Sequence, residues 1–279
     1  KWAYSLTFDD GWKSQYTHGA RLLGRYGYQG TIAIIGSRIN QENCVTTGDM
    51  QDLVARGWGL SNHTYSHPQR YVDYRNAAAA LADIRAANEA IMAAVPGYRP
   101  LVFTAPETDR DYLPLIAGNV DTLGLRAIQI LQYQGKQIDP DPANPNKYLM
   151  VDLGRSGLVS TGGEAPDYAA KMAQIHSNAL AGGHWWLTLH THAVIETCDC
   201  VETSTDYVFR TYGAGGSDEV WVAPVEVVLQ YLVARDHVRV SRVDEAGTPA
   251  AAMGVEPAPH PAPVVAATST LPTVSFRQQ

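Results

Sequence analysis

Two adjacent carboxylates follow a short apolar run near the start of the chain. The stretch YSLTFDDGW, residues 4–12, ends in Asp9 and Asp10, and Gly11 follows at once. Two carboxylates a few ångströms apart repel each other and raise one pKa, so either a solvated loop or a bound cation should offset the repulsion. Adjacent strand residues point to opposite faces, so both side chains can reach one centre only if the strand ends here. Gly11 permits the sharp turn that this requires.

Two histidines four positions apart supply candidate partners for that cation. In SNHTYSHP, residues 61–68, the spacing of His63 and His67 brings two imidazoles to one side of a helical turn, or of the loop before one. Such pairs also arise by chance, so this pair indicates a metal site only in combination with the carboxylates of Asp9 and Asp10. Two histidines, one carboxylate and a water form a common catalytic zinc arrangement. We therefore expect one aspartate to bind a cation while the other stays free beside it as a base.

A third candidate lies late in the chain, in HWWLTLHTH, residues 184–192. On a strand, Trp186 and His190 alternate onto one face, while Leu187 and Leu189 take the other. A histidine at the carboxyl end of such a strand is well placed for proton transfer. The alternative is a hydrogen-bonded histidine near the mouth of a barrel.

The elements that must position these groups alternate between two types. Predicted strands cover residues 2–8, 30–36, 58–64, 101–106, 125–133 and 184–192. Predicted helices cover residues 16–25, 46–57, 74–95 and 167–180, with one more helix and a strand within 220–243. This alternation indicates an α/β protein with parallel βαβ units, either a barrel or a doubly wound sheet. In a barrel, reactive groups collect at the carboxyl ends of the strands.

Composition narrows the class of protein. The chain has 279 residues, of which 45% are hydrophobic, a net charge of −7 and a pI near 5.7. This balance argues against a nucleic-acid partner, which a basic face would attract. No apolar run approaches the roughly 18 residues that a transmembrane helix requires. We expect one catalytic domain over residues 1–245 and a Pro/Ala-rich tail or linker over 246–279.

Three cysteines leave alternatives open. A disulfide within the CDC pair, Cys198 and Cys200, would be strained, whereas Cys44 is able to pair with either. One disulfide or two free thiols is the expectation, and a structural zinc on all three is the alternative. Lys1 begins directly at the first predicted strand, with no signal segment in this chain. We nevertheless expect a secreted, periplasmic or cell-envelope location.

Three motifs carry a family likeness. TFDDG, HTYSHP and LTLH, in this order, resemble the polysaccharide deacetylases of carbohydrate esterase family 4, the NodB-homology domain, over roughly residues 1–243. The resemblance implies a distorted (β/α)7-type barrel. It also implies a divalent metal, most often zinc, with Co²⁺ or Ni²⁺ as alternatives, and an acetylated carbohydrate substrate.

The resemblance also implies roles for particular residues. Asp9 would be the general base and His190 the general acid. Leu187 or Leu189 would help to form a pocket for the acetyl methyl group. The metal ligands would be Asp10, His63 and His67. Tyr65, Trp185 and Trp186 offer rings for stacking on sugars, although core packing explains them equally well.

The chain departs from the family pattern in two places. Where the family has an arginine and prolines, along the lines of FRPPYG, this sequence has FTAPET, so Thr104 stands in place of the arginine that orients the catalytic aspartate. Arg99 or Arg110 is a candidate substitute. The aspartate-tryptophan motif that tunes the catalytic histidine is not recognisable, and Asp139 and Asp141 are weak candidates for it.

The leading hypothesis is a metal-dependent hydrolase that removes acetyl groups from a saccharide. The bond is an amide, as in chitin or peptidoglycan, or an ester, as in xylan. The alternative is a carbohydrate-binding relative that keeps the metal and has little or no turnover. The missing arginine favours the alternative, whereas the intact Asp9 and His190 favour the enzyme.

Overall fold

The first predicted strand is β1 (Trp2–Phe8) of the computed structural model, which describes residues 1–131, 136–137, 151–157, 168–192, 194 and 200–237. All seven residues of β1 are buried, as a strand covered on both faces requires. Tyr4, Leu6 and Phe8 belong to a core cluster that includes residues of the surrounding helices. Ser5 and Thr7 alternate onto the opposite face of the strand, which lines the barrel.

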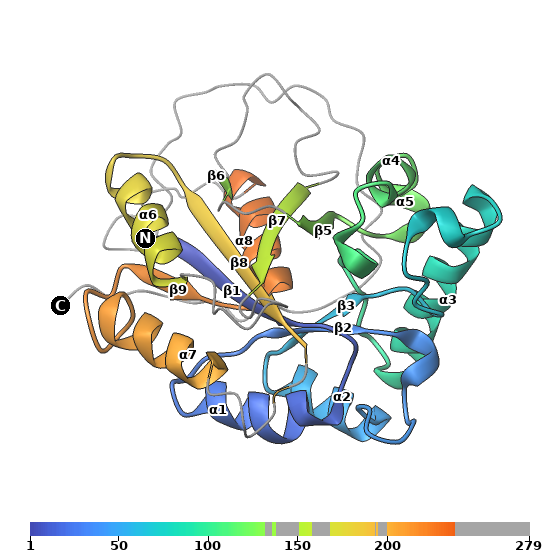
Figure 1. Cartoon of the computed structure of the whole chain (residues 1–279), viewed down its shortest axis with the longest axis horizontal. Coiled ribbons are helices and arrows are strands. Elements are labelled where there is room, and N and C mark those ends of the chain that lie inside the picture. The colour runs from blue at the N-terminus through green and yellow to red at the C-terminus, as the bar shows by residue number, and fades with distance from the viewer. Residues whose placement is uncertain (132–135, 138–150, 158–167, 193, 195–199, 238–279) are drawn as a thin grey trace, which may run out of the picture. The chain divides into compact units, whose positions relative to one another are not determined.

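Seven parallel strands follow one another in a ring. Around the ring, neighbouring strands pair in the order β1-β2-β3-β4-β5-β7-β8, and β8 pairs again with β1. β1 and β8 run side by side through the centre of Figure 1. The other strands of the ring are β2 (Thr31–Ile34), β3 (Gly59–Asn62), β4 (Val102–Thr104), β5 (Ala127–Leu131), β7 (Val151–Gly157) and β8 (Trp185–Thr191). The predicted (β/α)7-type barrel is thus confirmed.

Two short strands distort the ring. β6 (Lys136–Gln137) pairs antiparallel with β8, and β9 (Val220–Val222) pairs parallel with β1. β9 lies beside the beginning of β1, whereas β2 pairs with its end, at Thr7 and Phe8. β1 therefore has three neighbouring strands along its seven residues.

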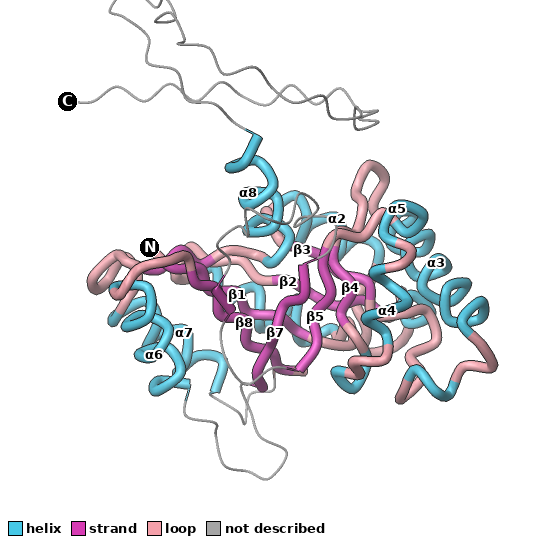
Figure 2. Tube along the Cα trace, turned by 90° about the horizontal axis from the view of Figure 1, so that it is seen from above, coloured by secondary structure: helices cyan, strands magenta, loops and turns pink. Residues whose placement is uncertain are grey.

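Helices cover the outside of the sheet. In Figure 2, α6 and α7 lie on one side of the strands, and α3, α4 and α5 on the other. The helices are α1 (Arg21–Gly24), α2 (Thr47–Ala55), α3 (Ala77–Ala94), α4 (Tyr112–Ala117), α5 (Val120–Leu123), α6 (Tyr168–Leu180), α7 (Cys200–Thr211) and α8 (Val225–His237). A π-helical segment precedes α1, and three short 3₁₀ segments lie in loops: Gln15–Ala20, Gly36–Arg38, Tyr71–Asp73 and Pro106–Thr108.

Side chains of the preceding loops fix where the central helices begin. Thr46 accepts a hydrogen bond from the backbone N–H of Asp49, whose side chain accepts one from the backbone N–H of Thr46, so α2 begins with a capping box. Asn76 caps α3 by accepting a hydrogen bond from the N–H of Ala79. These caps make α2 and α3 begin at Thr47 and Ala77, later than the predicted starts at residues 46 and 74.

The interior of the barrel is partly polar. Ser61 Oγ lies 2.8 Å from Thr104 Oγ1, which donates a 2.9 Å hydrogen bond to Oε1 of Gln129. At the amino ends of the strands, Thr31 Oγ1 donates to Oε2 of the buried Glu226 at 2.7 Å. Pairing satisfies these hydroxyls, so the barrel can bury them without the cost of an unpaired polar group.

The described residues form a compact unit over Lys1–His237. The predicted boundary at residue 245, the tail and the predicted strand after the last helix lie outside them. None of the helices in the described part is long and apolar enough to span a membrane.

Candidate metal centre

The carboxylate doublet lies where β1 ends. Asp9 is 2% exposed, and its backbone N–H still donates to the carbonyl of Thr191 at the end of β8, at 2.9 Å. Asp10 and Gly11 then take left-handed φ angles of 78° and 70°. The turn predicted from Gly11 is present, and it begins one residue earlier, at Asp10. It turns the Asp10 side chain away from the strand direction.

The two histidines lie on the loop after β3. His63 is 2% exposed, and its backbone N–H donates to the carbonyl of Ile34. The rings of His63 and His67 are 4.8 Å apart between centroids and meet edge to face. His67 itself has a φ of 55°. The pair thus converges through a loop, one of the two arrangements that the spacing allowed.

Asp10 and the two histidines bring three potential ligand atoms together. Oδ1 of Asp10 lies 3.7 Å from Nε2 of His63 and 3.4 Å from Nε2 of His67. All three atoms lie within 4.8 Å of one another. Ligand atoms at about 2.1 Å from a tetrahedral zinc are roughly 3.4 Å apart, so the donor set and its spacing fit a divalent ion.

Neighbouring groups orient these ligands. The Nδ1–H of His63 donates to the carbonyl of Thr104 at 2.6 Å, which fixes the tautomer and leaves the Nε2 lone pair for a metal. The indole N–H of Trp12 donates to Oδ2 of Asp10 at 3.1 Å and leaves Oδ1 facing the histidines. Both contacts are typical of the outer shell of a metal site.

The proton-transfer candidates lie on neighbouring strands. His190 pairs in register with Thr7, and Asp9 follows Thr7 by two positions. Residues in register share a face, as do residues two apart on one strand, so Asp9 and His190 come from the same side of the β1–β8 pair. His190 is half-buried.

Gln15 is a buried residue that the sequence did not single out. Its side-chain amide donates to the carbonyl of Asp9 and, at 3.1 Å, to the carbonyl of His192. It therefore ties the end of β1 to the end of β8. A buried glutamine at the start of a π-helical segment gave no signal in the sequence, although π-helical turns are frequent at functional sites.

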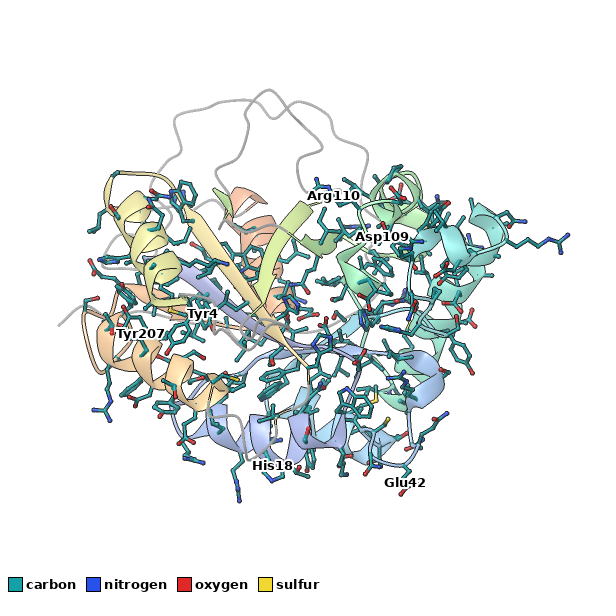
Figure 3. The ribbon with its side chains drawn as sticks, viewed as in Figure 1. Tyr4, His18, Glu42, Asp109, Arg110 and Tyr207 are labelled. Carbon is teal, nitrogen blue, oxygen red and sulfur yellow. The ribbon has the colours of Figure 1, made fainter. Side chains whose placement is uncertain are left out.

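The substitutes considered for the family arginine, Arg99 and Arg110, are exposed, whereas Asp9 is buried. Of the two, Arg110 lies at the edge of the molecule near α4 (Figure 3). Thr104 instead serves the metal centre through its carbonyl, which accepts from His63. Asp139 and Asp141 lie outside the described residues.

Two of the expected substrate contacts are buried elsewhere. Trp186 is 1% exposed, and its indole N–H donates to Oγ of Ser5 at 3.0 Å. Trp186 thus packs in the barrel interior of this structure, and its contact with a sugar ring stays a prediction. Leu189 is completely buried in the cluster that contains Met172 and Ile175 of α6. Its face of β8 is the one opposite to His190, so the structure does not place it with the catalytic candidates.

Cys44 takes no part in a disulfide. It is a free, buried thiol, which excludes the pairing with Cys198 or Cys200 that the sequence left open, and Cys200 is itself disulfide-bonded. Burial raises the pKa of the Cys44 thiol. Cys198 lies outside the described residues.

Solved structures define the class of fold. A putative polysaccharide deacetylase from Mycobacterium smegmatis has a TM-score of 0.53 at 17% identity, over 87% of this chain and 94% of that chain. The Xyl-CE4 domain of a multidomain xylanase from the hindgut metagenome of Trinervitermes trinervoides has a TM-score of 0.50 at 20% identity, over 86% and 93%. A BA3943 mutant, described as a CE4 family pseudoenzyme, has a TM-score of 0.53 at 14% identity, over 82% and 67%. At these identities the similarity shows the fold, a NodB-like (β/α) barrel.

Sequence comparison matches part of the chain to a protein family. Residues 2–128 match the family described as Polysaccharide deacetylase. The putative polysaccharide deacetylase YxkH of Bacillus subtilis (strain 168) is 32% identical over 62 residues, which is 22% of this chain and 22% of the length of that protein. The resemblance to the polysaccharide deacetylases is thus confirmed over residues 2–128, which contain the first two of the three motifs.

Proposed function

We propose that the chain is a divalent-metal-dependent hydrolase that removes acetyl groups from a poly- or oligosaccharide. One observation carries the proposal: Asp10, His63 and His67 converge with the spacing of a tetrahedral ligand set. The strands that end beside this centre carry Asp9 and His190, a carboxylate and an imidazole suited to proton transfer. The family match over residues 2–128 supports the same activity.

The residues divide the chemistry between them. Asp10, His63 and His67 would hold zinc, with Co²⁺ and Ni²⁺ as alternatives. A divalent ion there supplies a Lewis acid that polarises the acetyl carbonyl and acidifies water. Asp9, which is not one of the three converging ligands, accepts the proton of the attacking water. His190 then gives a proton to the departing amine or alkoxide.

The substrate is an acetylated saccharide, with an amide or an ester as the bond to be cleaved. Tyr65 lies between the two ligand histidines and is 41% exposed, so it offers a ring to a sugar at the metal loop. A polymeric substrate suits a secreted or cell-envelope location.

An acetate-release screen tests the proposal. Acetylated chitin oligomers, peptidoglycan fragments and acetylated xylan are incubated with the metal-loaded protein, with the chelated protein, and with the Asp10→Ala variant. Asp121→Ala is the matched control because Asp121 is exposed at the surface. Acetate from at least one substrate, lost with chelator and in Asp10→Ala but retained in Asp121→Ala, is the expected result.

The second candidate is a carbohydrate-binding relative with little or no turnover. The threonine in place of the family arginine favours it, since Thr104 carries no positive charge and its hydroxyl is bonded to Ser61 and Gln129. If the protein holds a stoichiometric metal ion yet releases no acetate from any of the amides and esters, this candidate replaces the hydrolase.

A further inference from the structure

The loop that carries both ligand histidines has an unusual backbone. Between His63 and His67 lie Thr64, Tyr65 and Ser66, and Thr64 and His67 have left-handed φ angles of 63° and 55°. Residues other than glycine hold such angles only when the surrounding structure over-determines them. Hydrogen bonds to this loop therefore bear directly on whether the two imidazoles converge.

The outer contact of the loop is a carboxylate on α3. Asp83 accepts hydrogen bonds from the backbone N–H of Tyr65 at 3.1 Å and from that of Ser66 at 3.2 and 3.3 Å. The hydroxyl of Tyr74 donates to the same carboxylate at 2.8 Å. Hydrogen bonds to an ionised acceptor are roughly twice as strong as neutral ones. Asp83 thus holds the two successive amides between the ligands, and it is not itself one of the three converging ligand residues.

The same helix also holds the start of the loop. Asn62, directly before His63, donates its side-chain amide to the carbonyl of Ile84 at 2.8 Å and to Oδ1 of Asn88 at 2.7 Å. Ile84 is completely buried and Asn88 is 7% exposed, so both partners belong to the packed face of α3. Asp83 lies one position before Ile84. The histidine loop is therefore attached to one rigid helix on both sides of His63.

Two other sets of hydrogen bonds also hold the loop. Within it, the N–H of Thr64 donates to Oδ1 of Asn62, and Oγ1 of Thr64 accepts from the N–H of His67. On the side of the residues after β2, the N–H of Gly36 donates to the carbonyl of Thr64 and that of Ser37 to the carbonyl of Tyr65, both at 3.0 Å. The bonds to Asp83 are distinct from both sets, because they hold the N–H groups of Tyr65 and Ser66 against α3.

We infer that Asp83 is a positioning residue that preorganises the metal loop. It holds the backbone between His63 and His67 in the metal-binding conformation before a metal ion arrives. The inference rests on the proposed metal centre but concerns a residue outside the ligand set. Partners of this kind change metal affinity by about 10- to 100-fold when they are removed.

The test measures metal affinity and loop mobility rather than turnover. Asp83→Asn keeps the size of the side chain and removes its charge and one acceptor oxygen. Zn²⁺ and Co²⁺ are titrated into the metal-free protein against a competing chelator. Amide hydrogen exchange is followed in the segment 62–68 of the same samples. We expect the variant to bind both ions about 10- to 100-fold more weakly and to exchange Tyr65 and Ser66 faster, with an unfolding temperature close to that of the wild type.

Two controls separate positioning from general damage. Tyr74→Phe removes one hydroxyl from the same carboxylate but leaves the loop bonds, so it should change metal affinity less than threefold. Asp52→Asn removes a half-buried carboxylate of α2 that pairs with Arg56 and should leave both readouts unchanged. Unchanged metal affinity and unchanged exchange in Asp83→Asn would overturn the inference.

A measurement on the wild-type protein covers the case in which Asp83→Asn does not fold. In the metal-free wild type, the amides of Tyr65 and Ser66 should exchange as slowly as those of the α3 interior. Exchange at the rate of an open loop overturns the inference without any variant. If the wild type binds neither ion, the proposed function fails, whereas slow exchange of these amides would still show that Asp83 orders the loop.

Discussion

The indole N–H of Trp12 donates to Oδ2 of Asp10 at 3.1 Å, while Oδ1 of the same carboxylate faces the two histidines. One oxygen is thereby committed to the protein and the other to a ligand position. This division explains how a half-buried carboxylate can present a single directed oxygen without rotating freely. It also places Trp12, two residues after its partner, beside the candidate metal centre and outside the three converging ligand residues.

Replacing Trp12 by phenylalanine removes that hydrogen bond and keeps an aromatic ring. We expect Trp12→Phe to bind zinc about tenfold more weakly, because loss of an outer-shell partner typically costs 10- to 100-fold in affinity. Competitive titration with a chromophoric chelator measures the change. Trp221→Phe, on β9 beside the beginning of β1, is the control and should bind zinc as the wild type does. Equal zinc affinity in both variants would show that the hydrogen bond from Trp12 to Asp10 does not contribute to metal binding.

Removal of a ligand should remove the metal and the activity together. Asp10→Ala and His63→Ala each leave two of the three ligands, which is too few to retain a zinc ion through dialysis. Elemental analysis of the dialysed variants, next to the wild type and Asp121→Ala, checks the metal content. A variant that keeps a full equivalent of metal would contradict the assignment of that residue as a ligand.

Replacing Asp9 should affect metal content and activity differently from replacing Asp10. Asp9→Asn keeps the shape of the side chain but removes the base, so we expect normal metal content and a fall in kcat of about 10²- to 10⁴-fold. Metal analysis and acetate release on one sample provide both numbers. Loss of metal in this variant would mean that the roles assigned to the doublet are wrong.

Gln15 provides a test of how closely the ends of β1 and β8 must be held. Gln15→Met matches the side chain in length but has no donor for the carbonyls of Asp9 and His192. We expect kcat to fall about ten- to a hundredfold with metal content unchanged, since small misplacements of reacting groups have effects of this size. Gln41→Met is the matched control, because Gln41 is exposed and donates to one carbonyl, that of Ser37. A kcat equal to that of the control would show that the hydrogen bonds of Gln15 to Asp9 and His192 do not affect catalysis.

Glu226 should make the stability of the fold depend on pH. The carboxyl group is buried, Oε2 accepts from Thr31, and Oε1 has no hydrogen-bond partner in the described structure. Burial raises the pKa of Glu226 from 4.5 to about 7. The folded state therefore holds this proton more tightly than the unfolded state does, and its contribution to stability is lost as the pH rises from 4.5 through 7.

The expected loss is measurable by denaturant unfolding. A difference between 4.5 and about 7, at roughly 1.4 kcal/mol per pKa unit, corresponds to about 3 kcal/mol between pH 4 and pH 8. Glu226→Gln should remove this part of the pH dependence. The free energy of unfolding of the variant, relative to that of the wild type, should therefore increase as the pH rises. Glu42→Gln is the control, because Glu42 lies exposed at the lower edge of Figure 3. If the free energy of unfolding depends on pH in the same way for Glu226→Gln and the wild type, a group other than Glu226 is responsible for the pH dependence.

Elements with a strong local pattern were predicted well from the sequence. β1 was predicted residue for residue because seven buried residues end at a doublet and a glycine. Residue chemistry, together with the rule that barrel strands present their carboxyl ends to one side, predicted that one aspartate of the doublet would meet His63 and His67. The family resemblance singled out Asp10, which the structure places with them.

Elements with a weak local pattern were missed. α4 and α5 are short and interrupted by Pro114 and Gly118. The sequence of α7 is rich in valine and threonine, which have low helix propensity. Gln15 and Asp83 act through hydrogen bonds to backbone groups distant in the sequence, and such contacts leave no periodicity in the sequence. The side-chain directions of Trp186 and Leu189 likewise depend on the closure of the ring.

The pairing of β1 with three other strands has a consequence for the order in which the barrel folds. β1 is synthesised before its partners β8 and β9, which follow only after residues 184 and 219. Until then, one edge of an apolar strand stays without its neighbour, because the ring closes through contacts of high sequence separation. Folding of this barrel must therefore wait until β9 has been synthesised, with the strand that presents the doublet among the last to be fully enclosed.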